Sequence, residues 1–290
     1  MRRDLSSAAA IVMNTAEAAS ALLAAAPELA RVPVATIPNG FDAGEFPAEP
    51  GQLQRGDRFR IVHAGHSHVE SDRRHIRILR AALGGAVRGL DTGTRSHLYL
   101  VRAVKELLSR RPDLREVIEI HLVGRVAGAP AEAPSGATVH SHGYLSHDEA
   151  VAALREADLL FLPMHDLGGS RRARIVPGKT YEYLAAGPPI LAAVPPGDAR
   201  DLLQAAGNSD VCAPTDVPAM SRAIERRIDS WRSGEPAPHA DEQVVRRFER
   251  RRLTRDLADV FDLVLEGGGH RAAEPTHVSF AHLSPSEVTP

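Results

Sequence analysis

Strand-like and helix-like segments alternate along most of this chain, and that alternation constrains the fold more than any other feature of the sequence. Short apolar runs that resemble buried strands occupy residues 59–64, 118–123, 159–162 and 189–193. Parallel strands need a crossover connection, usually a helix, whereas antiparallel strands can be joined by tight turns. The region from about residue 57 to 235 therefore predicts an α/β fold with a doubly wound parallel sheet.

The other elements follow from apolar spacing and from residues that begin or end helices. Ser146 and Glu149 form a capping box ahead of one helix, while Pro177 and Gly187 mark the start and end of another. Further strands are predicted at residues 10–13, 34–37, 138–140 and 210–212. Helices are predicted at residues 17–29, 73–83, 96–110, 149–157, 177–186, 217–231 and 241–265.

Composition excludes several classes of protein. The 35 Lys and Arg residues nearly balance 37 Asp and Glu residues, which argues against a protein that binds nucleic acid over its whole surface. The only cysteine, Cys212, excludes intrachain disulfides and is typical of a reducing compartment, so we expect a cytoplasmic protein. No apolar run approaches the length of a membrane span, and the run at residues 8–13 is too short for a signal peptide.

A polar stretch with Pro47, Pro50 and Gly51 is the best candidate for a domain boundary. The last residues contain a run of three glycines and little apolar content, which predicts disorder. The chain is therefore divided into an N-terminal unit with its linker, a large domain, a closing helix and a tail. Their bounds are residues 1–46, 47–240, 241–266 and 267–290.

The most informative segment lies around the helix predicted at residues 177–186. The N-terminus of such a helix directs free backbone N–H groups and the positive end of the helix dipole toward the preceding loop. Lys179 adds a positive charge in the first turn, and Glu182 follows on the same face. This arrangement suits a nucleotide diphosphate whose ribose hydroxyls reach the carboxylate. The alternative is an ordinary capped helix with a surface Lys–Glu pair.

Several segments, in the family's own order, resemble the retaining glycosyltransferases of family four, which have the GT-B fold. The matching segments are residues 37–42, 123–124, 143–146, 174–192 and 248–254. Residues 174–192 (RIVPGKTYEYLAAGPPILA) are similar to the donor-binding signature of the family. Residues 37–42 resemble its interdomain linker, and residues 248–254 resemble the start of its closing helix. The resemblance covers about residues 7 to 265.

The resemblance implies a Rossmann-like domain that forms the C-terminal, donor-binding half of a GT-B enzyme. It implies transfer of a hexose, with retention, from a UDP- or GDP-sugar to a glycan or lipid-linked acceptor, as in cell-surface polysaccharide biosynthesis. The catalytic residues would be Lys179 and Arg73, which neutralise charge that develops on the diphosphate. The donor-binding residues would be Gly65, His66, Arg74, Gly124, Arg125, Tyr144, Leu145, Arg174, Gly178, Thr180 and Glu182. No metal or other cofactor is implied, because basic side chains replace a divalent ion in this fold.

Two departures from the family pattern affect the predicted activity. Arg174 occupies a position where many members have an acid that contacts the donor sugar. Residues 1–46 match only the end of the family's first domain, so the chain looks like a donor-binding half with a remnant of the acceptor domain. The alternative function is therefore a nucleotide-sugar-binding module that acts with a separate acceptor-domain chain. Uncovered apolar surface would favour a homodimer.

For three further features the sequence leaves two interpretations open. The closely spaced residues His63, His66 and His68 invite a metal site, but no acidic or cysteine cluster accompanies them. The basic loop at residues 166–174 is either a lid over an anionic donor or a solvated loop. The arginines at residues 246–255 are either solvated or contact the inner face of a membrane. The same helix has an apolar stripe of Leu253, Leu257, Val260, Phe261 and Val264 that should pack on the protein.

Overall fold

A six-stranded parallel sheet forms the centre of the computed structural model, which describes residues 5–46, 56–65, 92–124, 134–169 and 171–267. Its strands are β3 (Phe59–Ala64), β4 (Ile118–Val123), β5 (Thr138–Gly143), β6 (Leu159–Pro163), β7 (Ile190–Ala193) and β8 (Ser209–Cys212). They pair in the order β5-β4-β3-β6-β7-β8. The order reverses between β3 and β6, and ligands of such sheets bind beyond the carboxyl ends of the strands at this switch point. The predicted doubly wound α/β fold is confirmed.

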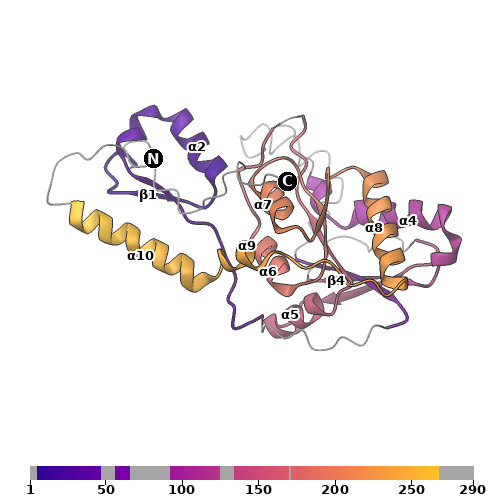
Figure 1. Ribbon diagram of the computed structural model, residues 1–290. Coiled ribbons are helices and arrows are strands. Elements are labelled where there is room, and N and C mark those ends of the chain that lie inside the picture. The colour runs from indigo at the N-terminus through magenta and orange to yellow at the C-terminus, as the bar shows by residue number, and fades with distance from the viewer. Residues whose placement is uncertain (1–4, 47–55, 66–91, 125–133, 170, 268–290) are drawn as a thin grey trace, which may run out of the picture.

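Helices cover both faces of this sheet (Figure 1). One face packs against α4 (Leu98–Arg110) and α8 (Val217–Arg232), and the other packs against a second group of helices. That group is α5 (His147–Arg155), α6 (Gly178–Ala186), α7 (Asp198–Ala206) and α9 (Glu242–Arg246). Successive side chains of a strand point to opposite faces, so a strand covered on both faces is apolar throughout. This explains why every residue of β6 is buried. It also explains why the strands could be recognised in the sequence as continuous apolar runs.

Local sequence signals mark most helix ends. The Ser146 hydroxyl and the Glu149 carboxylate form the expected capping box at the start of α5. Gly187 ends α6 with a φ of 102°, a conformation that favours glycine. Helix α7 was not predicted, because it follows Pro195 and Pro196, which are typical of a loop. The helix expected at residues 73–83 and the tail lie outside the described residues, apart from Gly267.

The N-terminal lobe, residues 5–46, contains a two-stranded parallel sheet. Its elements are β1 (Ile11–Met13), α2 (Ala16–Ala25), the 3-10 helix η1 (Pro27–Arg31) and β2 (Val34–Thr36). Leu29 is fully buried in its small apolar core. The prediction of one helix over residues 17–29 is wrong at its C-terminal end. The residue before a proline disfavours helical backbone angles, and Ala26 accordingly leaves the helix ahead of Pro27.

The chain crosses twice between the N-terminal lobe and the large sheet, and the two crossings are hydrogen-bonded. Phe41 N–H donates to the Phe248 carbonyl at 3.1 Å, and Arg250 N–H donates to the Phe41 carbonyl at 2.8 Å. These bonds separate α9 from α10 (Arg250–Gly267), so the prediction of one continuous helix over residues 241–265 is wrong. From this crossing α10 extends toward the side of the molecule where the N-terminal lobe lies (Figure 1).

Helix α10 buries a narrower stripe than the sequence predicted. Leu253 and Val260 are buried, whereas Phe261 is 60% exposed. Phe261 follows Val260 directly, which rotates it about 100° around the helix and off the packed face. Among the described residues, no helix has both the length and the apolar character that crossing a bilayer requires.

Gly40→Ala is expected to destabilise the double crossing. A Cβ atom at position 40 would lie 2.1 Å from the Phe248 carbonyl oxygen and 2.6 Å from Cδ1 of Leu253. Overpacking against backbone costs about 1–3 kcal/mol, so the midpoint of urea unfolding should fall. Gly56→Ala is the control, because its Cβ would meet Arg58 N only at 3.9 Å. Equal midpoints for the two variants would contradict this packing.

Candidate donor-binding site

The carboxyl ends of β3, β4 and β5 meet in one row of backbone groups. Gly65 N–H donates to the Val123 carbonyl at 2.8 Å, and Gly124 N–H donates to the Gly143 carbonyl at 2.7 Å. Gly124 has a φ of 111°, and a Cβ there would lie 2.5 Å from the Gly65 oxygen. Glycine is therefore required for this close approach of two strand ends. The row contains Gly65 and Gly124, two of the predicted donor-binding residues.

Lys179 extends from the first turn of α6 to the end of β3. Its Nζ donates to the Ala64 carbonyl at 3.3 Å, and a Cβ on Gly65 would lie 2.8 Å from the same Nζ. The missing side chain of Gly65 therefore leaves room for the ammonium group. This contact places the cation beyond the carboxyl end of β3, next to the switch point between β3 and β6.

Tyr183 fixes α6 to the end of β3. Its hydroxyl accepts a hydrogen bond from Ala64 N–H at 2.8 Å and lies 3.3 Å from the Ala64 carbonyl oxygen, to which it can donate. The side chain is fully buried, and burial raises its pKa, so the hydroxyl stays protonated. The sequence analysis missed this role, although Tyr183 follows Lys179 by four residues and therefore shares its helix face.

The ammonium group of Lys179 is electrostatically strained in the free protein. Burial, together with repulsion from the Arg95 guanidinium, lowers the pKa of Lys179 from its ordinary value of 10.5 to about 7, while Glu182 acts weakly in the opposite direction. An anion bound between Lys179 and Arg95 would relieve this repulsion. The arrangement is therefore prepared for a negatively charged ligand.

Arg95 was not predicted as a site residue. It ends the 3-10 helix η2 (Thr92–Arg95), which is attached to the loop after β6 because Asp166 N–H donates to the Thr94 hydroxyl at 2.8 Å. The buried Arg95 Nε has no hydrogen-bond partner within the described part of the chain. No motif or spacing marks this arginine in the sequence, since only the tertiary fold brings it near α6.

His63 is buried at the same end of β3. Its Nδ1–H donates to the Phe161 carbonyl at 2.9 Å, and its Nε2 has no hydrogen-bond partner among the described residues. Burial and then the nearby Lys179 hold the pKa of His63 well below its ordinary value, so the ring is neutral. His66 and His68, the other two of these three histidines, lie outside the described residues.

The other predicted residues of α6 differ in exposure. Gly178 is exposed at the mouth of the helix, and Glu182 is half-buried one turn further. Thr180 is fully buried, with a hydroxyl that has no hydrogen-bond partner in the described residues. Gly178 and Glu182 are thus open to a ligand, whereas Thr180 faces the protein interior.

Tyr144 and Leu145 follow β5, two strands from β3. Tyr144 is 80% exposed and Leu145 is half-buried. Neighbouring strands lie about 4.8 Å apart, so the end of β5 is about 10 Å from the end of β3. This separation suits a ligand whose phosphates lie near Lys179 and whose aromatic base lies near Tyr144.

The basic loop is attached to its surroundings through Arg172 and Arg174. Arg172 pairs with Glu17 of α2 at 2.7 Å and with Asp201 of α7 at 2.6 Å. The Arg174 carbonyl accepts a hydrogen bond from the Thr15 hydroxyl at 2.9 Å, while the Arg174 side chain is exposed. In the structure this loop joins the N-terminal lobe to α7.

Four predicted site residues lie outside the described residues. They are the catalytic candidate Arg73 and the donor-binding candidates His66, Arg74 and Arg125. The described candidates group into two places: Lys179, Gly65 and Gly124 with Arg95 at the strand ends, and Tyr144 with Leu145 beyond β5.

The fold is a doubly wound α/β domain, and the cationic site lies beyond the carboxyl ends of its strands, where ligands of such sheets bind. Residues 85–230 match the family described as Glycosyl transferases group 1. The match covers half of the chain, and the chain belongs to this family. No curated protein sequence matches the chain.

Solved structures with a similar fold bind nucleotides or make phosphorylated sugars. Anabaena Alr3699/HepE in complex with UDP and glucose is 16% identical, with a TM-score of 0.58 over 88% of this chain and 63% of that one. The UDP-forming α,α-trehalose-phosphate synthase from Burkholderia xenovorans is 13% identical, with a TM-score of 0.60 over 90% and 63%. Sucrose-phosphate synthase from Thermosynechococcus elongatus is 14% identical, with a TM-score of 0.57 over 92% and 61%. These likenesses show a GT-B type fold, and the chain spans less than two thirds of each protein.

Proposed function

We propose that this chain binds the nucleotide-diphosphate sugar donor of a retaining glycosyltransferase, with UDP or GDP as the nucleotide. The observation that supports this proposal is the meeting of Lys179, Arg95 and the N-terminus of α6 at the switch point of the sheet. In this proposal the two cations and the helix N–H groups hold the diphosphate. Tyr144 contacts the base, and Glu182 accepts hydrogen bonds from the ribose.

Transfer requires stabilisation of the diphosphate as the bond to the sugar breaks. Negative charge then develops on the leaving phosphate oxygen, and prearranged positive groups lower the barrier. Lys179 is held by its hydrogen bond to the Ala64 carbonyl before the donor arrives, so little reorganisation of this cation is needed. The same chemistry applies to a UDP- or GDP-sugar, and a glycan or lipid-linked molecule is the proposed acceptor.

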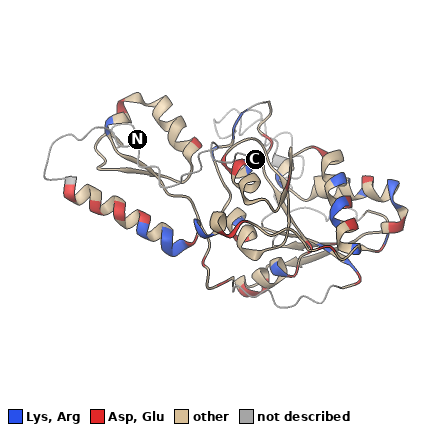
Figure 2. Ribbon diagram, in the orientation of Figure 1, with Lys and Arg blue, Asp and Glu red and all other residues tan. Residues whose placement is uncertain are grey.

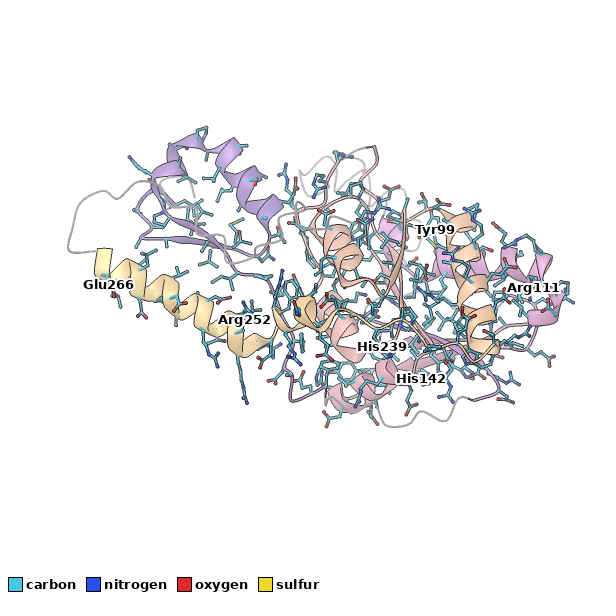
Figure 3. All side chains as sticks on the ribbon, in the orientation of Figure 1. Tyr99, Arg111, His142, His239, Arg252 and Glu266 are labelled. Carbon is cyan, nitrogen blue, oxygen red and sulfur yellow. The ribbon has the colours of Figure 1, made fainter. Side chains whose placement is uncertain are left out.

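The proposed membrane contact is limited to the first turns of α10. Figure 2 shows the arginines gathered there and acidic residues along the rest of the helix. Arg250, Arg251 and Arg252 are exposed, and Arg252 is labelled in Figure 3. This short basic patch could meet an anionic lipid headgroup of a lipid-linked acceptor. For the predicted homodimer, the exposed apolar side chains of Phe261 and Leu265 are the candidates for the contact surface.

Donor binding without transfer is the second candidate function. The site residues that the structure brings together, Lys179, Arg95 and Gly65, all belong to the large sheet and its helices. Calorimetric titration with UDP, GDP and uridine tests donor binding, which both candidate functions require. At least one of the two diphosphates should bind well above uridine. Release of UDP from UDP-glucose, measured with and without added glycan acceptors, separates the two functions. If the chain binds neither UDP nor GDP, both candidate functions are refuted.

Glu182→Gln is expected to weaken UDP binding by about 5- to 20-fold, because a charged acceptor of the ribose hydroxyls becomes neutral. The 2′,3′-dideoxy analogue of UDP lacks these hydroxyls, so its affinity should be the same for parent and variant. Titration of both proteins with both ligands gives the comparison. Equal losses for the two ligands would place Glu182 away from the ribose.

A further inference from the structure

Three histidines and one glutamate gather on β4 and the edge strand β5, and His142 directly precedes Gly143 of the row of strand ends. His121 of β4 is directly opposite His140 of β5 in the strand register. Glu119 lies two residues before His121, and His142 lies two residues after His140 (Figure 3 labels His142). Residues two apart on a strand share one face of the sheet, opposite the buried Ile120. The four side chains therefore form one cluster, here called the edge histidine cluster.

Short distances connect all four side chains. His121 Nε2 lies 3.3 Å from a Glu119 carboxylate oxygen, and His140 Nε2 lies 3.8 Å from the other. His121 Nδ1 lies 3.0 Å from His142 Nε2. The rings of His121 and His140 have centroids 4.7 Å apart, and those of His121 and His142 are 5.2 Å apart. One ligand atom from each of Glu119, His121 and His140 falls within 4.8 Å of the others.

We infer that Glu119, His121 and His140 form a binding site for a divalent transition-metal ion, with Zn²⁺ the expected occupant. Ligands about 2.1 Å from a tetrahedral ion are separated from one another by about 3.4 Å. The two distances from Glu119 to the histidine nitrogens, 3.3 and 3.8 Å, bracket this value. Imidazole and carboxylate ligands suit Zn²⁺, and three protein ligands leave the fourth position to water.

His142 orients His121 in this site and is not a ligand. In the absence of an ion, His121 Nε2–H donates to Glu119 and Nδ1 accepts from His142. With the ion bound, the Nε2 lone pair of His121 binds the ion and Nδ1–H donates to His142. Hydrogen bonds of this kind, from the second nitrogen of a metal-binding histidine, fix its tautomer and ring orientation.

Burial favours the cluster as a prepared site. The side chains of His121 and Glu119 are only 19% and 16% exposed, while His140 is 41% exposed and leaves a route from solvent. Arg58 lies 3.6 Å from Glu119 and balances its charge while the site is empty.

Zinc titration of the full chain, purified without a histidine tag and treated with EDTA, tests the inference. The double variant His121→Ala/His140→Ala should bind Zn²⁺ at least about 100-fold more weakly than the parent. The control is His147→Ala/His239→Ala, which removes two exposed histidines outside the cluster. It should bind Zn²⁺ as the parent does. His142→Ala should lose about 10-fold, less than the loss from the double variant.

Co²⁺ provides an independent signature, because a tetrahedral site gives an intense visible absorption that an octahedral surface site lacks. The parent and the control should show it, and the double variant should not. If the double variant does not fold, Glu119→Gln, which preserves volume, replaces it and should bind Zn²⁺ at least about 10-fold more weakly. Equal zinc affinity of the parent and either cluster variant would overturn the inference, as would an equal loss in the control.

Discussion

Lys179→Ala is expected to weaken UDP binding by about 10- to 150-fold, corresponding to about 1.5–3 kcal/mol for a hydrogen bond to a charged group. The ammonium group lies beyond the end of β3, 3.3 Å from the Ala64 carbonyl, and Arg95 acts on it directly. Removing it takes away one of the two cations that the proposal assigns to the diphosphate. The affinity for uridine, which has no phosphate, should change less than about twofold.

Lys105→Ala is the matched control for this variant. Lys105 is the other lysine of the chain and is exposed on α4, so its removal takes away at least as much positive charge as the removal of Lys179. Calorimetric titration of the parent and both variants with UDP, GDP and uridine gives the full comparison. If Lys105→Ala weakens UDP binding as much as Lys179→Ala does, the loss of affinity comes from the change in net charge. The helix of residues 178–186 would then not be the donor site.

The sequence predicted the large sheet well because its strands are buried on both faces. The expected bounds of β3 and β4 agree with the structure, and each strand is followed by a glycine. Gly65 leaves room for the Lys179 ammonium group, and Gly124 allows the close approach of the Gly65 backbone. Pro177 likewise predicted where helix α6 begins. These features depend on neighbours in the sequence, which local propensity and periodicity report.

Features that depend on distant contacts could not be predicted. The break between α9 and α10 is stabilised by bonds from Phe41, about 200 residues earlier in the chain. Arg95 reaches the site only because β6 lies beside β3. His121 and His140 come together through strand register, and one residue of slip would place His121 on the other face. To predict any of these features, one must know which segments far apart in the sequence lie side by side in the fold.

The buried position of Lys179 connects donor binding to stability. A lysine whose pKa in the folded protein is about 7 and whose ordinary value is 10.5 binds fewer protons folded than unfolded between these pH values. The free energy of unfolding should therefore rise with pH from about 7 to 10.5. Lys179→Met, which has no charge to bury, should be more stable than the parent below pH 7 while losing donor affinity. Binding sites commonly contain residues that lower the stability of the protein while they increase its affinity for the ligand.

The affinity for UDP-glucose is expected to fall as pH rises above about 7, by up to tenfold per pH unit. Each phosphate of this ligand carries one ester and one anhydride bond and has a single, strongly acidic oxygen, so neither titrates near neutrality. The ligand prefers the ammonium form of Lys179, and binding above pH 7 must therefore take up a proton. Below pH 7 the lysine of the free protein is already charged, and the affinity should level off.

Lys179→Arg separates this titration from other effects of pH. A guanidinium stays protonated throughout the range, so the variant should bind UDP-glucose with little change between pH 6.5 and 9, near and above the parent's pKa of about 7. Calorimetry in buffers of different ionisation enthalpy measures the proton taken up by the parent, and the variant should take up none. If the variant keeps the parent's pH profile, another group titrates in the site. If both profiles are flat, Lys179 does not contact the diphosphate as a proton-coupled cation.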